Sequence, residues 1–358
     1  VAYAFPELDL IVCYMSQSRG TSSLRTFEEA ISHLLLVPDA EAFARLIAPP
    51  SPESVDEFLG LYARENRVES IGAMIKLNGR LAFELGSRQV MLLRATEERD
   101  RWVPERAPHD SIMFQRQDGR VTGFMLFNNG RAMKATRFEP APDLPDLDEL
   151  MALRCRAVSA EAVQALLPLR VKLTGESGPQ KFGATMMLDR RSRAVTEADF
   201  GTAGIMRARG AGDRARGQMP GEPAARELFG LERAEEVAGS LASTLGDWRT
   251  FHPKILVLAR EQLDEADVLR VRTVSRDGLA STKLVSMETG AVLVEYGISV
   301  LPGAGLVPVE TRHRDFRSVE GVSLSHAQTM RLGGATGGTI EMRIESVEPR
   351  AAIDGSVF

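Results

Sequence analysis

The stretch LVPVETRHRDFRSVEGVSLSHAQTM, residues 306–330, decides the fold of the second half of this chain. It contains two strand-like segments on either side of a turn at Glu320 and Gly321. Further strand-like segments surround it: KILVLARE (254–261), VLRVRTV (268–274), STKLVSME (281–288), AVLVEYG (291–297) and GTIEMRIESVEP (338–349). Such an unbroken antiparallel series must curl to bury one face. The sequence therefore predicts a strongly bent sheet or open barrel, closed by helices.

The segments before this series supply the helices and more strands. Apolar residues at helical spacing predict short helices over 147–158 and 159–169 and a longer one over about 223–245. Strand-like segments lie between them, at RVKLTGE (170–176), FGATMMLD (182–189) and AGIMRARG (203–210). We therefore expect one unit, over residues 145–358, in which the helices close the curled sheet.

The middle of the chain, residues 51–139, shows a different pattern. Turn signals recur at short intervals, at Asn78-Gly79, Asp118-Gly119 and Asn129-Gly130. Asn-Gly and Asp-Gly adopt the positive φ angles of tight hairpin turns at little steric cost. The flanking residues alternate between apolar and polar, so this block predicts an antiparallel meander or small barrel.

The first 37 residues read as two strands joined at Pro6-Glu7, followed by a helix in which apolar residues recur every three or four positions. Strand, strand and helix are too little to bury both faces of a sheet. We therefore expect the partners of this segment to lie upstream of Val1. The predicted fold class is α+β, mostly antiparallel β, with these three units in order.

Composition excludes several classes of protein. With 358 residues the chain has room for two or three domains. Its net charge of −5 argues against a nucleic-acid partner. No apolar run approaches the roughly 18 residues of a transmembrane span. Cys13 and Cys155 lie far apart without metal-type spacing, so no metal or cofactor is expected.

Three resemblances to known families follow from particular stretches. VAYAFPELDLIVCYMSQS and the next helix, residues 1–37, resemble the end of the serine β-lactamase-like and penicillin-binding hydrolases. SVDEFLGLY and QDGRVTGFMLFNNGRAMKATR, within 51–139, resemble the small β-domain of unknown function that commonly follows that hydrolase domain. METGAVLVEY, residues 306–330 and TIEMRIESVEPRAAIDGSVF resemble the outer-membrane lipoprotein carriers, whose fold is a half-barrel with helices across its apolar concave side.

The hydrolase resemblance implies a serine nucleophile with a lysine three residues later. The chain contains no Ser-x-x-Lys, no Gly-x-Ser-x-Gly and no His-Glu-x-x-His. We therefore expect no catalytic residue in this chain. We also expect its partner to be the hydrolase domain that is missing upstream of Val1. The resemblance also implies a periplasmic or cell-envelope location.

Two functions remain open at this point. The chain is either the non-catalytic C-terminal part of a bacterial envelope serine hydrolase, or a binding module whose half-barrel holds an apolar or lipid-like ligand. For the second function, Met187, Leu228, Phe229 and Trp248 are the predicted cavity lining, because they lie on the segments expected to close the mouth of the half-barrel.

Two charged motifs also carry alternatives. His313 and Asp315 share a face if the strand is regular, so they form either an acid–base site or a structural pair. Arg207, Arg209, Arg214 and Arg216 stand among glycines. They form either an anion-binding loop or a flexible, solvated one, and the solvated loop is the favoured interpretation.

Overall fold

The computed structural model describes residues 2–5, 10–13, 55–354 and 357. Within 55–354 it leaves out 66, 68–70, 78–79, 86–88, 106–109, 129, 212–213, 229, 277, 302–304 and 334–337. Strand β1 (Ala2–Phe5) pairs antiparallel with β2 (Leu10–Cys13), as the first residues predict. The helix expected over 24–37 lies outside the described residues.

A closed eight-stranded barrel follows a 3₁₀ turn at Val55–Phe58. Its strands are β3 (Gly60–Ala63), β4 (Gly72–Leu77), β5 (Arg80–Leu85), β6 (Gln89–Ala95), β7 (Arg101–Pro104), β8 (Ser111–Gln117), β9 (Arg120–Asn128) and β10 (Arg131–Arg137). The barrel closes where Thr136 of β10 pairs with Ala63 of β3. The turn between β8 and β9 uses positive φ angles at Asp118 and Gly119, as expected for an Asp-Gly hairpin.

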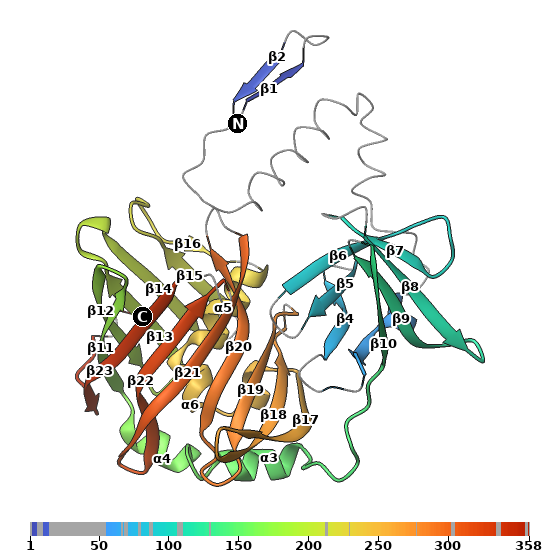
Figure 1. Ribbon diagram of the computed structural model, residues 1–358. Helices are drawn as coiled ribbons and strands as arrows, with labels where there is room; N and C mark the ends of the chain where they lie inside the picture. The colour runs from blue at the N-terminus through green and yellow to red at the C-terminus, as the bar shows by residue number, and fades with distance from the viewer. Residues whose placement is uncertain are drawn as a thin grey trace.

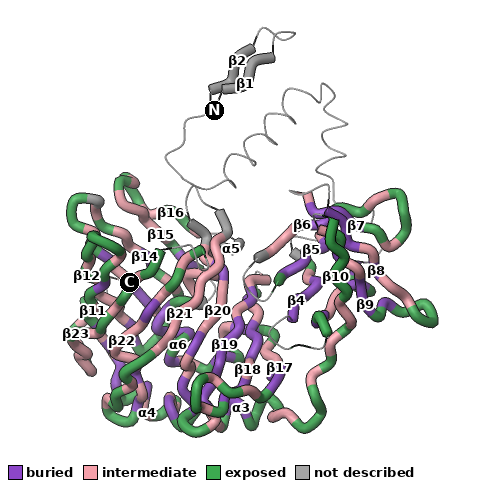
Figure 2. The backbone as a smooth tube through the Cα atoms, viewed as in Figure 1, coloured by how far each residue is buried: buried purple, intermediate pink, exposed green. Residues whose placement is uncertain are grey.

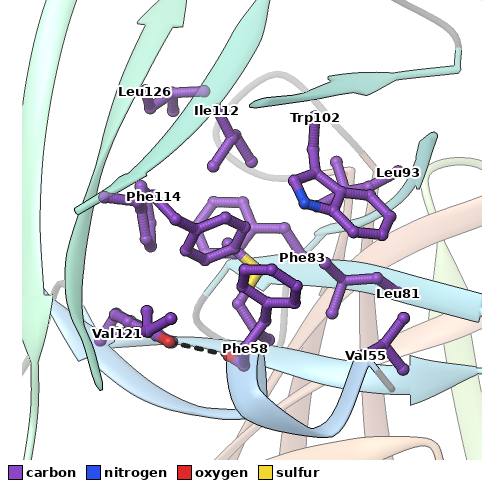
Figure 3. Packing of buried hydrophobic residues seen from close by; sticks show 13 residues of the cluster. Val55, Phe58, Leu81, Phe83, Leu93, Trp102, Ile112, Phe114, Val121 and Leu126 are labelled. Carbon is purple, nitrogen blue, oxygen red and sulfur yellow. Dashed lines mark hydrogen bonds between the residues drawn. The ribbon is translucent and has the colours of Figure 1, made fainter. Parts of the chain in front are cut away.

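The interior of the barrel is a packed core rather than a ligand site. Aromatic rings fill it (Figure 3): the ring centroids of Phe58 and Trp102 lie 5.5 Å apart, and those of Phe58 and Phe114 lie 4.4 Å apart. The buried hydroxyl of Tyr62 donates to the Phe58 carbonyl at 2.8 Å. An eight-stranded barrel is just wide enough for side chains to fill in this way.

The second half of the chain forms a 13-stranded antiparallel sheet that curves around the helices (Figure 1). In spatial order its strands are β16 (Arg226–Glu227), β15 (Arg214–Gln218), β14 (Ile205–Ala211), β13 (Arg193–Asp199), β12 (Gln180–Leu188), β11 (Leu169–Ser177), β23 (Thr339–Pro349), β22 (Val322–Leu332), β21 (Gly305–Val319), β20 (Val292–Leu301), β19 (Ala280–Ser286), β18 (Ala266–Val274) and β17 (Lys254–Leu263). Neighbours in space are mostly neighbours in sequence. The exception is β11, which pairs with the late strand β23.

The described residues place five α-helices with this sheet: α3 (Leu147–Arg154), α4 (Ala160–Leu166), α5 (Gly230–Gly239), α6 (Leu241–Leu245) and α7 (Trp248–Phe251). Helices α5 and α6 lie within the curve of the sheet (Figure 1). The single helix expected over 223–245 is therefore two helices with a short strand before them. Ser240 causes the break, because its extended backbone caps α6 and its hydroxyl accepts a hydrogen bond from the Ser243 amide.

The barrel packs against the opposite face of the sheet from the helices. On β17, Val257 packs in the cluster that contains Trp248, whereas the next residue, Leu258, packs against Ala63 and Ala73 of the barrel. Buried residues accordingly crowd β17–β19 beside the barrel (Figure 2). A buried ion pair, Glu84 with Arg272, also joins the two parts. Because β17 is covered on both faces, its residues are apolar at consecutive positions.

The described part of the chain is mostly antiparallel β with few helices, a closed barrel and one large curved sheet. This confirms the predicted architecture at that level. It does not confirm an α+β class or a hydrolase remnant. None of the described helices is long and apolar enough to span a membrane.

Candidate binding cavity

A cavity of about 290 Å³ lies between helices α3 and α4 on one side and α6 and α7 on the other. Its walls are mostly apolar, and three of its lining residues, Arg154, Asp247 and Arg249, carry charge. The main apolar contributors are Met151, Val163, Leu167, Leu188, Leu245 and Trp248. An apolar cavity with a few polar groups is the usual form of a small-molecule site.

Arg154 is the most unusual of these residues. It is only 7% exposed. Its guanidinium donates to the carbonyls of Gly290 at 3.0 Å and Thr244 at 3.2 Å, and its Cζ lies 4.5 Å from the ring centroid of Trp248. No carboxylate of the described residues forms an ion pair with it. Burial lowers the pKa of Arg154 to about 10, so the side chain is still charged at neutral pH.

The sequence around Arg154 explains why it is held there. Helix α3 begins with a capping box, in which the Asp146 side chain accepts a hydrogen bond from the Glu149 backbone N–H and the Glu149 side chain accepts one from the Asp146 backbone N–H. Its last turn packs against the turn between β19 and β20 at Gly290. Gly290 has a φ of +73°, and a Cβ at this position would collide with the Leu153 carbonyl oxygen. Only glycine allows so close an approach of the two backbones.

A second charged group lies near the same ring. The ammonium of Lys283, on β19, is 5.7 Å from the ring centroid of Trp248 and forms an ion pair with Glu295 on β20. Burial opposes ionisation of Glu295, but the charge and hydrogen bond of Lys283 outweigh it, so the pKa of Glu295 is lowered. Trp248 is therefore a neighbour of two cations, of which Lys283 has a carboxylate partner.

Two histidines flank this ion pair. Burial lowers the pKa of His252 and of His313 to about 4 each; Lys283 adds to both shifts and Glu295 opposes both. His252 is buried, and neither of its ring nitrogens has a hydrogen-bond partner among the described residues. Both imidazoles are thus neutral at pH 7. No group of three or more His, Cys, Asp or Glu side chains suited to a metal ion occurs in the described ranges.

The structure separates the residues that the sequence predicts as a cavity lining. Trp248 lines the cavity. Met187 lies on the other face of β12 from the cavity residue Leu188, between Arg170 and Val195 on the neighbouring strands. Leu228 packs beside Gly217 at the far edge of the sheet, and Phe229 lies outside the described residues. As a group, the four residues stay a prediction.

His313 and Asp315 do not form a site. The pairing of β21 with β22 keeps the same register before and after Asp315, but Asp315 itself has an irregular backbone, with a φ of +51°. Asp315 is exposed and binds Arg317 at 2.6 Å, whereas His313 is partly buried and its charged neighbours are Glu295 and Lys283. Asp315 therefore pairs with Arg317 rather than with His313.

The four arginines are also not in a loop. Arg207 and Arg209 lie on β14, and Arg214 and Arg216 lie on the adjacent strand β15, with Arg209 opposite Arg216. The alternation of arginine with alanine or glycine was the signal for strands. Ala208 and Ala215 are buried, so the small residues face inward and the arginines face outward.

Sequence reasoning missed Arg154, although a signal was present. Leu147, Leu150 and Met151 form the apolar stripe of α3, and Arg154 occupies the next position of that stripe, seven residues after Leu147. A cation on the buried face of a helix needs a partner. Lys283 and Glu295 carried no comparable signal, because their pairing depends on the register of β19 against β20.

Comparisons with known proteins identify no family for the chain. No family model matches the sequence, and no curated protein does. Among solved structures, the chain is similar to a LolA superfamily protein from Nitrosomonas europaea, with 10% identity and a TM-score of 0.43 over 58% of this chain and 97% of that chain. It is also similar to a DUF1329 family protein from Desulfovibrio piger, with 10% identity and a TM-score of 0.41 over 58% of this chain and 96% of that one.

A third similar structure is a putative outer membrane lipoprotein-sorting protein domain from Vibrio parahaemolyticus, at 8% identity and a TM-score of 0.41, over 58% of this chain and 94% of that domain. With TM-scores below 0.5 and identities of 10% or less, these structures assign no role to this chain. The expected serine hydrolase parent has no support among them. At such low scores and identities, the functional conclusion has to come from the cavity itself.

Proposed function

We propose that this chain is a binding module that holds a ligand with an apolar body, such as a single acyl chain, in the cavity beside Trp248. The observation that carries the proposal is a cavity of about 290 Å³ with mostly apolar walls. This volume lies at the lower end of the range of about 300–1,000 Å³ for small-molecule sites. It therefore fits one chain rather than a multi-chain lipid.

The energy of burial is large enough for measurable binding. Each methylene moved from water into an apolar site contributes about 0.8 kcal/mol, so eight of them contribute about 6 kcal/mol before the cost of association. Because about 6 kcal/mol corresponds to a dissociation constant of tens of micromolar before that cost, we expect a ten-carbon chain to bind in the high-micromolar range or more weakly. The resemblance of residues 145–358 to the carriers supports a periplasmic or envelope location as part of the same proposal.

Trp248 provides the assay. In a Trp102→Phe background it is the remaining tryptophan, and its fluorescence should change saturably when decanol is added below its solubility limit. Ala160 is exposed at the mouth of the cavity, so Ala160→Phe should block entry without overpacking the core. We expect at least a tenfold loss of affinity.

Ala165 provides the matched control. It is also an exposed alanine of α4 but does not line the cavity, so Ala165→Phe should leave the affinity unchanged. The proposal is wrong if the Trp248 signal does not respond to decanol, or if the two phenylalanine variants bind decanol equally well.

A further inference from the structure

The charges around the cavity do not balance on its inner side. Arg249 is exposed and already binds Asp247, at 2.7 Å, and Asp148, at 3.3 Å. Arg154 is buried, and it contacts two backbone carbonyls and the face of Trp248; the carboxylate of Glu295, which is paired with Lys283, attracts it as well. Two cations, Arg154 and Lys283, thus share the one carboxylate of Glu295, which leaves an excess positive charge at the inner wall.

Hydrogen-bonding capacity gives the same result. A guanidinium has five N–H donors, and Arg154 uses two of them, toward Gly290 and Thr244. Its Nε donates to none of the described residues. Both ring nitrogens of His252 are buried away from solvent without a hydrogen-bond partner among the described residues. The Nε of Arg154 is not buried in this way. Arg154 is also a lining residue of the cavity, so donors beyond these two lie next to it.

A buried cation without a counter-ion is costly, and carbonyl dipoles together with an aromatic face offset that cost in part. A planar anion offsets the rest most effectively, because a guanidinium binds a carboxylate through two parallel hydrogen bonds. Lys283 does not need such a ligand, since it is paired with Glu295. The alternative cation near Trp248 is therefore already neutralised.

We infer that the ligand carries an anionic head group, a carboxylate or a phosphate, on its single acyl chain, and that Arg154 binds this head group at the face of Trp248. This inference rests on the proposed function, because it assigns the polar end of the same ligand. The apolar walls formed by Met151, Val163 and Leu245 would then enclose the chain. Arg154 thus adds a charged anchor to a site for which the sequence predicted only Met187, Leu228, Phe229 and Trp248 as lining.

The test compares four ten-carbon ligands on the whole chain by isothermal titration calorimetry, which does not depend on Trp248 fluorescence. The ligands are decanoate, decyl phosphate, decanol and decyltrimethylammonium, each below its micelle or solubility limit. We expect the better of the two anions to bind at least tenfold more tightly than decanol, and the cation to bind more weakly than decanol. Which anion binds more tightly identifies the head group.

Variants then assign the preference to Arg154. Arg154→Met should remove the preference for anions and leave decanol binding within about threefold of the wild type, whereas Arg249→Gln should keep the preference. If Arg154→Met does not fold, Arg154→Lys replaces it, and the order of the four ligands on the wild type still decides. Equal affinity for decanoate, decyl phosphate and decanol, unchanged in the Arg154 variant, overturns the inference alone. Failure of all four ligands to bind overturns the proposed function instead.

Discussion

Breaking the ion pair between Glu84 and Arg272 should destabilise the protein strongly. The Glu84 side chain is 1% exposed and that of Arg272 is 4% exposed. The guanidinium binds both carboxylate oxygens, with Nη1 2.9 Å from Oε1. In Glu84→Gln the shape is kept, but an amide NH₂ replaces one acceptor and faces the donors of Arg272. The guanidinium then remains charged and poorly paired in an apolar interface.

Removal of one member of a buried ion pair costs about 3–5 kcal/mol, which lowers the folding equilibrium constant by about 10²- to 10³-fold. Urea unfolding can locate this loss, because Trp102 lies in the barrel core and Trp248 beside the sheet. With Trp102→Phe and Trp248→Phe as reporter backgrounds, each part of the protein is followed separately. We expect Glu84→Gln to shift both transitions to lower urea concentration.

Two further variants decide what the shift means. Replacing both partners, Glu84→Met with Arg272→Met, should recover most of the stability, because no unpaired charge is left. Asp315→Asn breaks an exposed pair with Arg317 and should not change the unfolding midpoint measurably. If Glu84→Gln is no more harmful than Asp315→Asn, the barrel and the sheet are not joined through this contact.

Three other predictions concern the helices and the turn beside the cavity. Burial, and then the charge of Glu235, raise the pKa of Glu236 to about 7, so the folded state loses stability as pH rises from 4.5 to 7. In urea unfolding, Glu236→Gln should be up to about 3 kcal/mol more stable than the wild type at pH 8, and no more stable at pH 4.5. For His252, burial lowers the pKa to about 4, so as pH falls from 6.5 to 4 the unfolded state binds a proton before the folded state does and the protein loses stability. Between pH 7.5 and pH 4.5, the free energy of unfolding of His252→Leu should therefore fall by about 2 kcal/mol less than that of the wild type. Equal losses would contradict the burial of this side chain. Gly290→Ala should lower the free energy of unfolding by about 2 kcal/mol or more, because its φ is positive and the new Cβ collides with the backbone of α3. Gly119→Ala also has a positive φ, of +78°, but no atom within 4 Å of its Cβ, so it should lower the free energy of unfolding by less. If thermal unfolding ranks the two variants in the reverse order, α3 does not depend on its close approach to Gly290.

Local sequence signals were sufficient for most of the strands of this chain. Alternation and turn residues predicted the strands from 254 to 349, and Asp118-Gly119 predicted a hairpin of the barrel. Strand β13, residues 193–199, had no such signal, because RAVTEAD is weakly apolar and gains its burial from neighbouring strands. Its existence depends on tertiary packing, which no short window of sequence contains.

The candidate site was harder to predict than the fold for a related reason. A site consists of residues from several elements, and its composition depends on register and on bulges. Met187 and Leu188 are adjacent, yet only Leu188 faces the cavity. Asp315 was expected to meet His313 across two positions of a strand, yet it binds Arg317 on the other side. Arg154 and Gly290 meet only because the end of α3 packs on a turn far along the chain.

The pairing of β11 with β23 has a consequence for biosynthesis. Leu169 pairs with Pro349 and Ser177 with Ile340, so one of the first strands of the large sheet bonds with its last one. During translation, β11 therefore emerges with one edge unpaired and must wait until residues 339–349 have left the ribosome. Such late, long-range closure slows folding and leaves an exposed edge open to wrong partners. We expect nascent chains stalled before residue 339 to bind chaperones. Once residues 339–349 have emerged and β23 has paired with β11, we expect the chaperones to dissociate.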